Sequence, residues 1–527
     1  MSKKSAKIGA WILCDQISPD AAPLKGVKVG DVRIVLIEAQ AVPTSHTCHK
    51  KKLVLHLASM RHFRDELQQL GYTVDYYSLD EADAKKRAAV EQGLEATLRH
   101  FLKSSGVKQL RWMESNEYDQ QNEYQALVEK LGVPSKRLAN NLFIHSLDEF
   151  TKWEKAQDDL IMENYYRIIR RKMGVLMEGD YPTGGRWNYD IENRVPPMDN
   201  MNFPALPQPR SDAYIDEAAK LVEKRFPDFF GTTKDFIFPV TREGAKVWFQ
   251  DFVDNRLRLF GMYQDAMVRE NWFMYHSVVS PMMNIGLIDP IDTVKAVENA
   301  YYHGNTPINS SEGFIRQVIG WREYIRGIYW SQMPKYRDLN FFGCTESVPQ
   351  MFEDGRSRMN CVKIIVEQTR DVGYAHHIQR LMIVGNFCLL AGIHPKEAAK
   401  WFLEKYVDAY EWVVLPNVLG MILFADGGYL GTKPYAASAN YIGKMSNYCK
   451  GCFYRPRKRV GEKACPFNFL YWYFLQRNAE VLKGNKRMTM VYNLLRRKTD
   501  SEVQMVVRSS EEFLAKIHKH GTDRRVK

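Results

Sequence analysis

The chain has 527 residues, and its 74 Lys and Arg exceed its 62 Asp and Glu to give a formal net charge of +12. This length predicts two to four domains, because a single hydrophobic core seldom grows past roughly 250–300 residues. An apolar fraction of 45% excludes a disordered chain and a collagen-like repeat. No apolar run approaches the roughly 18 residues that cross a bilayer, so no membrane association is expected.

The N-terminal stretch MSKKSAKIGAWILCDQ is basic and then apolar, but it lacks a small-residue cleavage site, so it predicts a first strand rather than a signal peptide. The positive charge favours an anionic partner such as nucleic acid. Eight cysteines are too few for a disulfide scaffold, and their clustering toward the C-terminus favours a metal or cluster site in a reducing compartment. We therefore expect a cytoplasmic protein.

The first part of the chain alternates apolar, β-rich runs with helical stretches. The runs are 7–14, 32–38, 73–79 and 109–114, and the helical stretches are 54–70, 87–104 and 120–132. This alternation predicts right-handed βαβ units in a parallel, Rossmann-like sheet covered on both faces, over residues 1–135. No GxGxxG loop and no Walker sequence accompanies it, so neither a dinucleotide nor a nucleoside triphosphate is indicated.

Residues 136–239 are irregular and include the Pro/Gly-rich stretch GDYPTGGRWNYDIENRVPP. A segment of this length without periodicity is usually functional or an interdomain connector. Residues 240–527 have an almost entirely helical pattern, as over 314–329, where apolar residues recur at helical spacing. The fold class expected is thus an α/β domain, a long connector and an all-helical domain.

The clearest local motif is a cysteine array near the C-terminus. Cys449, Cys452 and Cys465 form a C-x2-C-x12-C pattern followed by Pro466. Such thiolates converge on one centre when a fourth ligand joins them, and Cys344, Cys361 and Cys388 are the candidates for it. Of these, Cys388 lies in the apolar run NFCLLAG and has the pattern of a core thiol. Spacing alone fits both zinc and an iron–sulfur cluster.

A second group of motifs lies in the helical region. In HSVVSPMMNIGLIDP, Ser277 and Ser280 offer hydroxyls at a helix start that suit a pyrophosphate, although S-x-x-S-P is also an ordinary helix cap. FIRQVIGWREYIRGIYW, GYAHHIQRLMIVGNF and YEWVVLPNVLGM follow. With WILCDQIS, SMRHF and GGRWNYDIENR, these motifs resemble the photolyase/cryptochrome flavoproteins. The resemblance is closest to the iron–sulfur bacterial cryptochromes and prokaryotic (6-4) photolyases, and it spans residues 11–475.

The resemblance implies an α/β antenna domain followed by a helical domain that binds FAD and a [4Fe–4S] cluster. The cluster ligands it implies are Cys361, Cys449, Cys452 and Cys465. The FAD-binding residues it implies are Tyr263, Ser277, Ser280, Trp321, Glu411 and Asn417. It places the Asn417 amide beside flavin N5, where a hydrogen bond would tune the stability of the reduced flavin. Without the resemblance, the pattern at Asn417 is typical of a helix-cap asparagine.

His376 and His377 are the candidate residues for proton transfer. On a regular helix, His377 shares a face with Leu381, Val384 and Cys388, which is typical of a core histidine. The resemblance instead implies a histidine pair that faces a DNA lesion, with His377 as the general acid and His376 as its neighbour. An ordinary pKa of about 6.5 suits histidine for that role.

The resemblance also implies a second chromophore, 6,7-dimethyl-8-ribityllumazine, in the antenna domain. Cys14, Asp15 and Gln16 follow the first strand, and Glu38 ends the second. Carboxyl ends of parallel strands bind ligands in open α/β sheets. We expect Glu38 to accept hydrogen bonds from the lumazine, although a solvated loop acid has the same pattern.

The connector supplies Asp190, Glu192 and Arg194. We expect Asp190 to hold a divalent ion such as Mg²⁺ or to order Arg194 near the lesion, and a salt-bridged loop is the plainer alternative. Basic stretches with aromatic residues favour a DNA track, although each alone is typical of a solvated helix face. These stretches are 165–172, 453–459 and 494–498.

One segment departs from the pattern of the family. Many photolyases have a tryptophan after the position of Asn417, whereas this chain has VLGMILF there. We therefore expect Trp401 to donate electrons to the flavin. Tyr435 and Tyr441 either extend that path, contact the lesion or have a structural role.

The sequence thus predicts light-driven repair of (6-4) photoproducts in UV-damaged DNA by a monomeric bacterial enzyme that acts at the nucleoid. One alternative is a signalling cryptochrome that keeps FAD without repair activity, against which the histidine pair argues. Another is a redox-active iron–sulfur DNA-binding protein related to primase, against which the flavin motifs argue.

Overall fold

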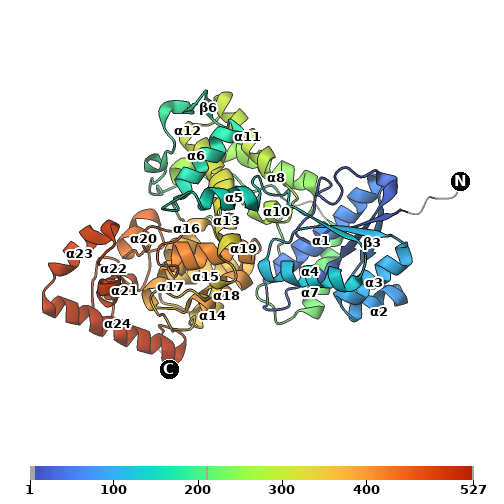
Figure 1. Cartoon of the computed structure of the whole chain (residues 1–527). Coiled ribbons are helices and arrows are strands. Elements are labelled where there is room, and N and C mark those ends of the chain that lie inside the picture. The colour runs from blue at the N-terminus through green and yellow to red at the C-terminus, as the bar shows by residue number, and fades with distance from the viewer. Residues whose placement is uncertain (1–5, 209–211, 525–527) are drawn as a thin grey trace. The chain divides into compact units, whose positions relative to one another are not determined.

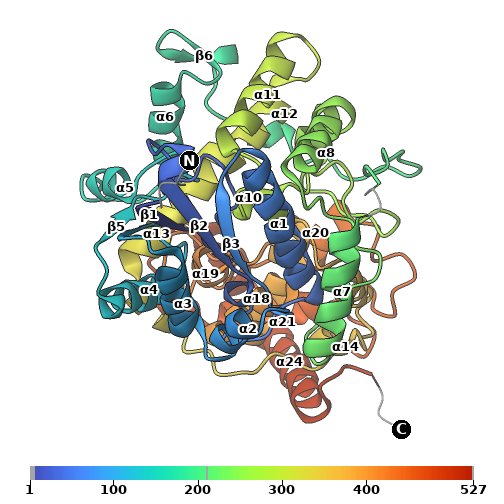
Figure 2. The ribbon, with the colours of Figure 1, turned by 90° about the vertical axis from the view of Figure 1, so that its right-hand side faces the viewer.

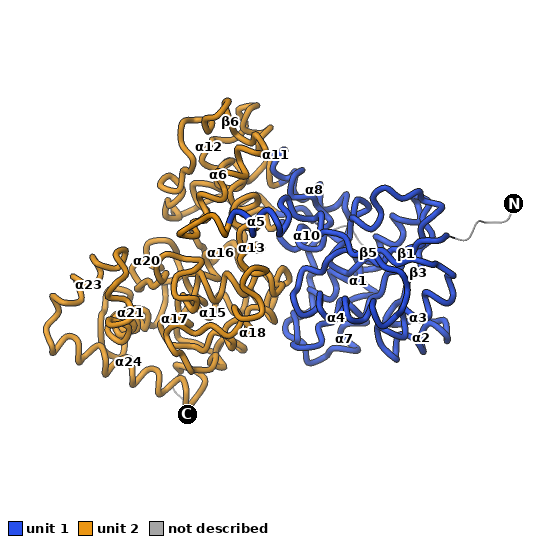
Figure 3. The backbone as a smooth tube through the Cα atoms, in the orientation of Figure 1, with its two compact units in different colours: residues 1–153, 206–251, 279–296 blue, residues 154–205, 252–278, 297–527 orange. Residues whose placement is uncertain are grey.

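The computed structural model describes residues 6–208 and 212–524 (Figure 1). The chain forms two compact units that are discontinuous in sequence (Figure 3). Unit 1 comprises residues 1–153, 206–251 and 279–296, and unit 2 comprises 154–205, 252–278 and 297–527. The sequence pattern, by contrast, indicates three consecutive stretches. Among the described helices, none is long and apolar enough to cross a membrane.

Unit 1 contains the predicted parallel sheet, in the strand order β3-β2-β1-β4-β5. Its strands are β1 (Ile8–Trp11), β2 (Val32–Ile37), β3 (Thr73–Tyr77), β4 (Gln109–Met113) and β5 (Ser135–Leu138). Four of them match the predicted runs. Strand β5 has no counterpart among the predicted runs, because its residues SKRL are polar and mostly exposed at the sheet edge.

Helices cover both faces of this sheet, as expected (Figure 2). On one face lie α1 (Lys50–Gln69) and α7 (Ala213–Arg225), and on the other lie α3 (Leu94–Ser105) and α4 (Tyr118–Leu131). The core between the sheet and the second helix pair is rich in aromatic residues, including Trp11, Phe101, Trp112 and Tyr124. Helix α7 lies in the stretch expected to be irregular, and Asp212 caps it by accepting from Tyr214 N and Ile215 N.

Unit 2 is predominantly helical, which confirms the second half of the predicted fold class. The elements that position the sites below are α6 (Met162–Met173), α9 (Leu257–Tyr263), α12 (Ile308–Ile315), α13 (Glu323–Gln332), α15 (Asn360–Val372), α16 (His377–Gln379), α17 (Asn386–Ala391), α18 (Pro395–Lys405), α19 (Glu411–Leu415), α20 (Ala439–Met445) and α21 (Pro466–Arg477). Toward the C-terminus follow α23 (Thr489–Arg496) and α24 (Asp500–His520).

Three π-helical turns interrupt these helices: η5 (Arg316–Arg322), η7 (Arg380–Gly385) and η8 (Pro416–Ile422). A π turn contains an extra residue and therefore shifts the face on which the following side chains point. The continuous helix predicted over 314–329 is consequently divided by η5. Such turns are frequent at functional sites, and these three carry or adjoin Trp321, His377 and Asn417.

Candidate active site and metal centre

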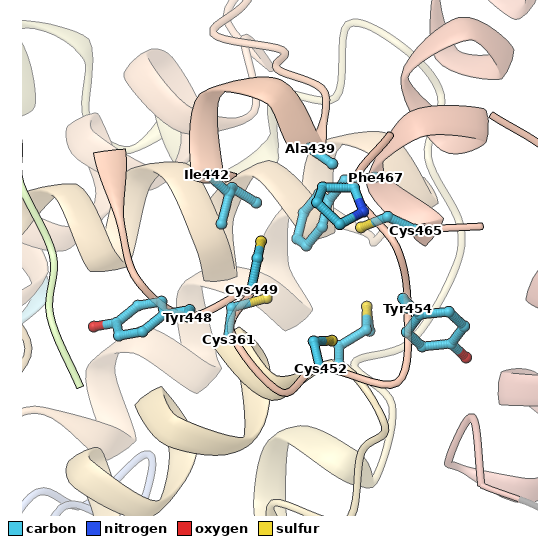
Figure 4. A pocket seen from close by; sticks show the side chains of 11 residues that line it. Cys361, Ala439, Ile442, Tyr448, Cys449, Cys452, Tyr454, Cys465 and Phe467 are labelled. Atoms are coloured by element: carbon cyan, nitrogen blue, oxygen red, sulfur yellow. The ribbon is translucent and has the colours of Figure 1, made fainter. Parts of the chain in front are cut away.

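Four cysteines from three separate segments line one cavity in unit 2 (Figure 4). Cys361 lies in the first turn of α15, Cys449 and Cys452 occupy a turn after α20, and Cys465 caps α21. Gly451 adopts a φ of +73°, which lets the chain turn tightly between Cys449 and Cys452. The remaining lining residues are Met359, Ala439, Ile442, Tyr448, Tyr454, Pro456 and Phe467.

Burial makes this cavity unfavourable for bare thiolates. It raises the pKa of Cys449 to about 11 and that of Cys465 to about 12, and it raises the pKa of Cys361 well above its ordinary value. All four thiols are free rather than joined in disulfides. Cys344 and Cys388 do not line the cavity. Within the described ranges, no three His, Cys, Asp or Glu side chains are placed to hold a single metal ion.

The histidine pair lies at the start of α16. His376 is 1% exposed, and its ring stacks on that of His276, with centroids 4.3 Å apart and planes inclined by 12°. His377 is exposed, whereas Leu381 and Val384 are buried. The common face expected for these residues is absent here because η7 changes the helical spacing directly after α16.

All three imidazoles are shifted toward the neutral form. Burial, followed by repulsion from His377, lowers the pKa of His276 to about 3, and burial lowers that of His376 well below its ordinary value. Desolvation by the surrounding protein, and then the Arg380 guanidinium, lower the pKa of His377 to about 4, although its side chain remains partly open to solvent. At neutral pH the free protein therefore carries these histidines uncharged.

Five of the six residues expected to bind FAD belong to unit 2, whereas Ser280 begins α10 (Ser280–Asn284) in unit 1. Glu411 accepts a hydrogen bond from Tyr329 Oη at 2.5 Å and lies 3.7 Å from Arg337. Asn417 Nδ2 donates to Val413 O at 2.8 Å, which leaves the amide oxygen outside that bond.

The other three expected FAD-binding residues lie on different elements of unit 2. Tyr263 ends α9 and is buried, Ser277 lies in the loop that follows His276, and Trp321 lies in η5. Tyrosine, tryptophan, serine and amide side chains of this kind suit the aromatic ring and the polar edge of a flavin.

Trp401 is buried in α18, a helix that packs against η8 and hence against the turn that carries Asn417. Its indole Nε1 donates to Phe352 O at 3.2 Å, and its ring centroid lies 5.8 Å from that of Tyr406. The donor role expected for Trp401 stays a prediction.

The connector turn is pinned by ionic and amide contacts. Asp190 forms an ion pair with Arg316, which also pairs with Glu312 at 3.0 Å. Asn193 is fully buried and exchanges hydrogen bonds with Asn309. Arg316 is thus the cation beside Asp190, rather than Arg194.

Arg194 instead interacts electrostatically with the partly buried carboxyl group of Asp265. Burial raises the pKa of Asp265 to about 6, against the attraction of Arg194, and Tyr441 forms a hydrogen bond to Asp265. Tyr435 is 39% exposed and lies within electrostatic range of Asp190 and Arg194. The structure therefore brings the connector together with both tyrosines singled out in the sequence.

The three basic stretches differ in availability. In 165–172, Arg170 is fully buried and donates to the carbonyl oxygens of Val175 and Leu176 at 3.1 and 2.7 Å, so it is not free to bind phosphate. The arginines of 453–459 and 494–498 are exposed.

The residues expected to bind the antenna chromophore lie in unit 1, at the carboxyl ends of β1 and β2. Asp15 Oδ2 accepts from Asn116 Nδ2 at 2.7 Å, while Asp15 Oδ1 and Gln16 Oε1 are buried without a hydrogen-bond partner. Burial raises the pKa of Asp15 to about 6. Because β1 and β4 flank the point where the strand order reverses, these oxygens lie where doubly wound sheets bind ligands.

Glu38 is fully buried, and its own surroundings supply its hydrogen bonds. Oε1 accepts from Arg61 Nε at 2.8 Å and from Tyr76 Oη at 2.7 Å. Oε2 accepts from Leu79 N at 2.7 Å and from Arg61 Nη2 at 3.5 Å. These four donors occupy the lone-pair sites of a carboxylate, which leaves Asp15 and Gln16 as the available acceptors.

Sequence reasoning missed His276, Asp265 and Arg316. His276 directly precedes the S-x-x-S-P motif, so its position was a usable signal, but its stacking on His376 joins residues 100 positions apart. Asp265 lies in a turn after α9, and Arg316 lies in the motif FIRQVIGWREYIRGIYW, but only the fold brings the two residues to the connector.

Known proteins share this combination of a parallel α/β unit and a helical unit. A family model described as deoxyribodipyrimidine photo-lyase-related protein matches residues 10–238. A protein of Agrobacterium fabrum named (6-4) photolyase is 44% identical over 506 residues, which cover 96% of this chain and 99% of that protein. The chain belongs to the photolyase/cryptochrome family.

Two solved structures support the fold alone. A bacterial class III photolyase from Agrobacterium tumefaciens aligns with a TM-score of 0.53 at 16% identity and covers 98% of this chain and 90% of its own. A Synechocystis cryptochrome aligns with a TM-score of 0.57 at 13% identity, over 84% of this chain and 86% of its own.

Proposed function

We propose that the protein repairs (6-4) photoproducts in UV-damaged DNA, driven by light. The observation that carries this proposal is the histidine array, in which the partly buried His276 stacks on the buried His376 and the exposed His377 adjoins them. A relative that is 44% identical over nearly the whole chain and is named (6-4) photolyase supports the same reaction.

FAD would supply an electron to the lesion from its reduced form. Tyr263, Ser277, Trp321, Glu411 and Asn417 of unit 2 would hold it. Their mixture of aromatic, hydroxyl and amide groups fits the cofactor. The Asn417 oxygen, which is outside the bond to Val413, is available as an acceptor.

His377 would act as the general acid. When an electron enters the lesion, negative charge develops there, and a proton must arrive as the hydroxyl returns to the neighbouring base. A pKa of about 4 keeps His377 neutral in the free protein. The phosphates of bound DNA, and the charge that develops on the lesion, favour the imidazolium form of His377. DNA binding would therefore promote protonation of His377 beside the lesion.

The cysteine cavity would hold a [4Fe–4S] cluster. Four free thiols line it, yet no three ligating side chains among the described residues are placed for one metal ion. A cluster interposes several metal atoms between the thiolates and therefore requires wider spacing than zinc does. Bound iron would also compensate the thiolates that burial disfavours.

The unit 1 crevice would hold the lumazine. The buried, unpartnered oxygens Asp15 Oδ1 and Gln16 Oε1 suit the N–H edge of a pteridine-like ring. Glu38 would support the site indirectly, because it fixes Arg61 and Tyr76.

The connector turn would face damaged DNA. Asp190 and Asn193 anchor it, and Ile191 between them is 90% exposed. Exposed Arg194 offers a phosphate contact, and Ile191 offers an apolar surface to an unstacked base. Because Arg316 already pairs with Asp190, this carboxylate does not depend on a divalent ion for charge compensation.

Light-dependent repair of an oligonucleotide with one defined (6-4) lesion tests the function, with a cyclobutane-dimer oligonucleotide as the control. Conversion of the (6-4) substrate alone is expected. Repair of only the dimer would overturn the choice of lesion, and repair of neither would favour a signalling cryptochrome. An absorption spectrum without flavin bands would contradict both.

A further inference from the structure

Gln379 connects the cysteine cavity with the histidine pair through a short, buried chain of hydrogen bonds. Its Oε1 accepts from the backbone N–H of His376 at 3.0 Å, and its Nε2 donates to Tyr448 Oη at 2.9 Å. Gln379 is 0% exposed and Tyr448 is 1% exposed, so water does not compete for these bonds.

The direction of this chain is fixed. A backbone N–H can only donate, so the amide oxygen of Gln379 must face His376 and its nitrogen must face Tyr448. Gln368 holds the same orientation from the side, because its amide exchanges two hydrogen bonds with that of Gln379, at 2.9 and 3.0 Å. Gln379 therefore has a single arrangement that satisfies its neighbours.

Tyr448 belongs to the wall of the cysteine cavity. It directly precedes Cys449, and its carbonyl oxygen accepts from Asn360 Nδ2 at 2.8 Å, beside Cys361. Figure 4 shows its ring next to Cys449, with the hydroxyl pointing away from the sulfurs. A group bound between Cys361 and Cys449 thus fixes the residue that Gln379 contacts.

At the other end, His376 begins the helix that carries His377. Its ring is held by the stack on His276, and its N–H by Gln379. We propose that the Tyr448–Gln379 bridge positions the paired histidines from the cysteine centre, so that the centre orients the proton donor as well as stabilising the fold. This inference rests on the proposed function of His377.

Tyr448→Phe tests the bridge with little change of shape, since the ring still lines the cavity. We expect iron content and FAD absorption to stay at the wild-type level, while kcat for (6-4) repair falls by about tenfold or more, because small displacements of a reacting group are costly. KM should stay within about twofold, since phosphate contacts are untouched. Backbone amides 376–380 should exchange hydrogen faster.

Tyr454→Phe is the matched control. Tyr454 also lines the cavity, but its hydroxyl donates to Asp523 at 2.9 Å, away from the histidines. It should leave kcat and the exchange of 376–380 unchanged. Gln379→Met, which removes the amide at the centre of the bridge, should reproduce the effects of Tyr448→Phe.

Wild-type kcat and exchange in Tyr448→Phe would overturn the bridge, and so would equal losses in both tyrosine variants. If the wild type repaired no (6-4) lesion, the proposed function would fail, while the exchange comparison would still decide whether the cavity positions His376.

Discussion

The cysteine cavity and the histidine pair lie in the same unit, and burial shifts their acid–base equilibria in opposite directions. It raises the pKa of Cys449 to about 11 and lowers that of His276 to about 3, because it disfavours the charged form of each. The metal-binding form of cysteine is charged and needs a cation, whereas a neutral imidazole needs none. We therefore expect folding to depend on a cation bound at the cysteine cavity, whereas the histidine pair needs no bound cation for the protein to fold.

The largest expected effect is that of removing a cluster ligand. Cys449→Ala should abolish iron binding and reduce soluble yield severely, because structural metal binding contributes on the order of 10 kcal/mol to folding. Iron content and soluble yield of the purified protein measure this. Cys388→Ala is the control, since Cys388 is a buried thiol that lies outside the cavity. Full iron occupancy in Cys449→Ala would refute the ligand assignment.

The second effect should appear in repair alone. His377→Ala should lower light-driven (6-4) repair by roughly 10²-fold, the usual scale for a lost general acid. FAD content, photoreduction and thermal stability should change little, because the side chain is exposed. His376→Ala should lower repair less if His376 only orients its neighbour. Wild-type repair by His377→Ala would remove that residue from the mechanism.

The same contrast explains what the sequence predicted well. Three of the four cysteines that line the cavity lie close together in the sequence, and alternating strands and helices identify the parallel sheet, so spacing and periodicity sufficed to group these residues. Strand β5 could not be predicted in this way, because an exposed edge strand needs no apolar pattern. The exposure of His377 could not be read from helical spacing, because η7 breaks it, and the His276–His376 stack depends on tertiary packing.

A third prediction concerns two buried carboxylates of unit 1, Asp15 and Glu38. Asp15→Asn should weaken lumazine binding by about tenfold, the scale of one hydrogen bond to a charged group, without lowering the melting temperature. Glu38→Gln should do the reverse, because it neutralises the fully buried one of the three carboxylates that pair with the buried Arg61 guanidinium. Fluorescence titration with the lumazine and thermal melts separate the two. Equal loss of ligand affinity in both variants would contradict this division.

The smallest effect is on the pH dependence of stability. His276 and His376 ionise well below the ordinary pKa of about 6.5, so between that value and their folded pKa the unfolded chain binds more protons than the native one. Stability that is present above pH 6.5 is therefore lost as the pH falls toward 4. Each such histidine accounts for up to about 1.4 kcal/mol per pH unit.

His276→Phe isolates this contribution, because phenylalanine keeps the stack on His376 without titrating. The groups that act electrostatically on His276 are His377, Arg256 and His376, all cationic when protonated, so their mutual repulsion deepens the loss in acid. Asp15 and Asp265, whose pKa values are raised to about 6, stabilise the protein as the pH falls and offset part of the wild-type slope.

The free energy of unfolding of the wild type should therefore be compared with that of His276→Phe, by urea unfolding at pH 7, 6 and 5. We expect a shallower decline in His276→Phe. Parallel declines would show that His276 has the same pKa in the folded and the unfolded chain. The stack on His376 would then not keep His276 neutral.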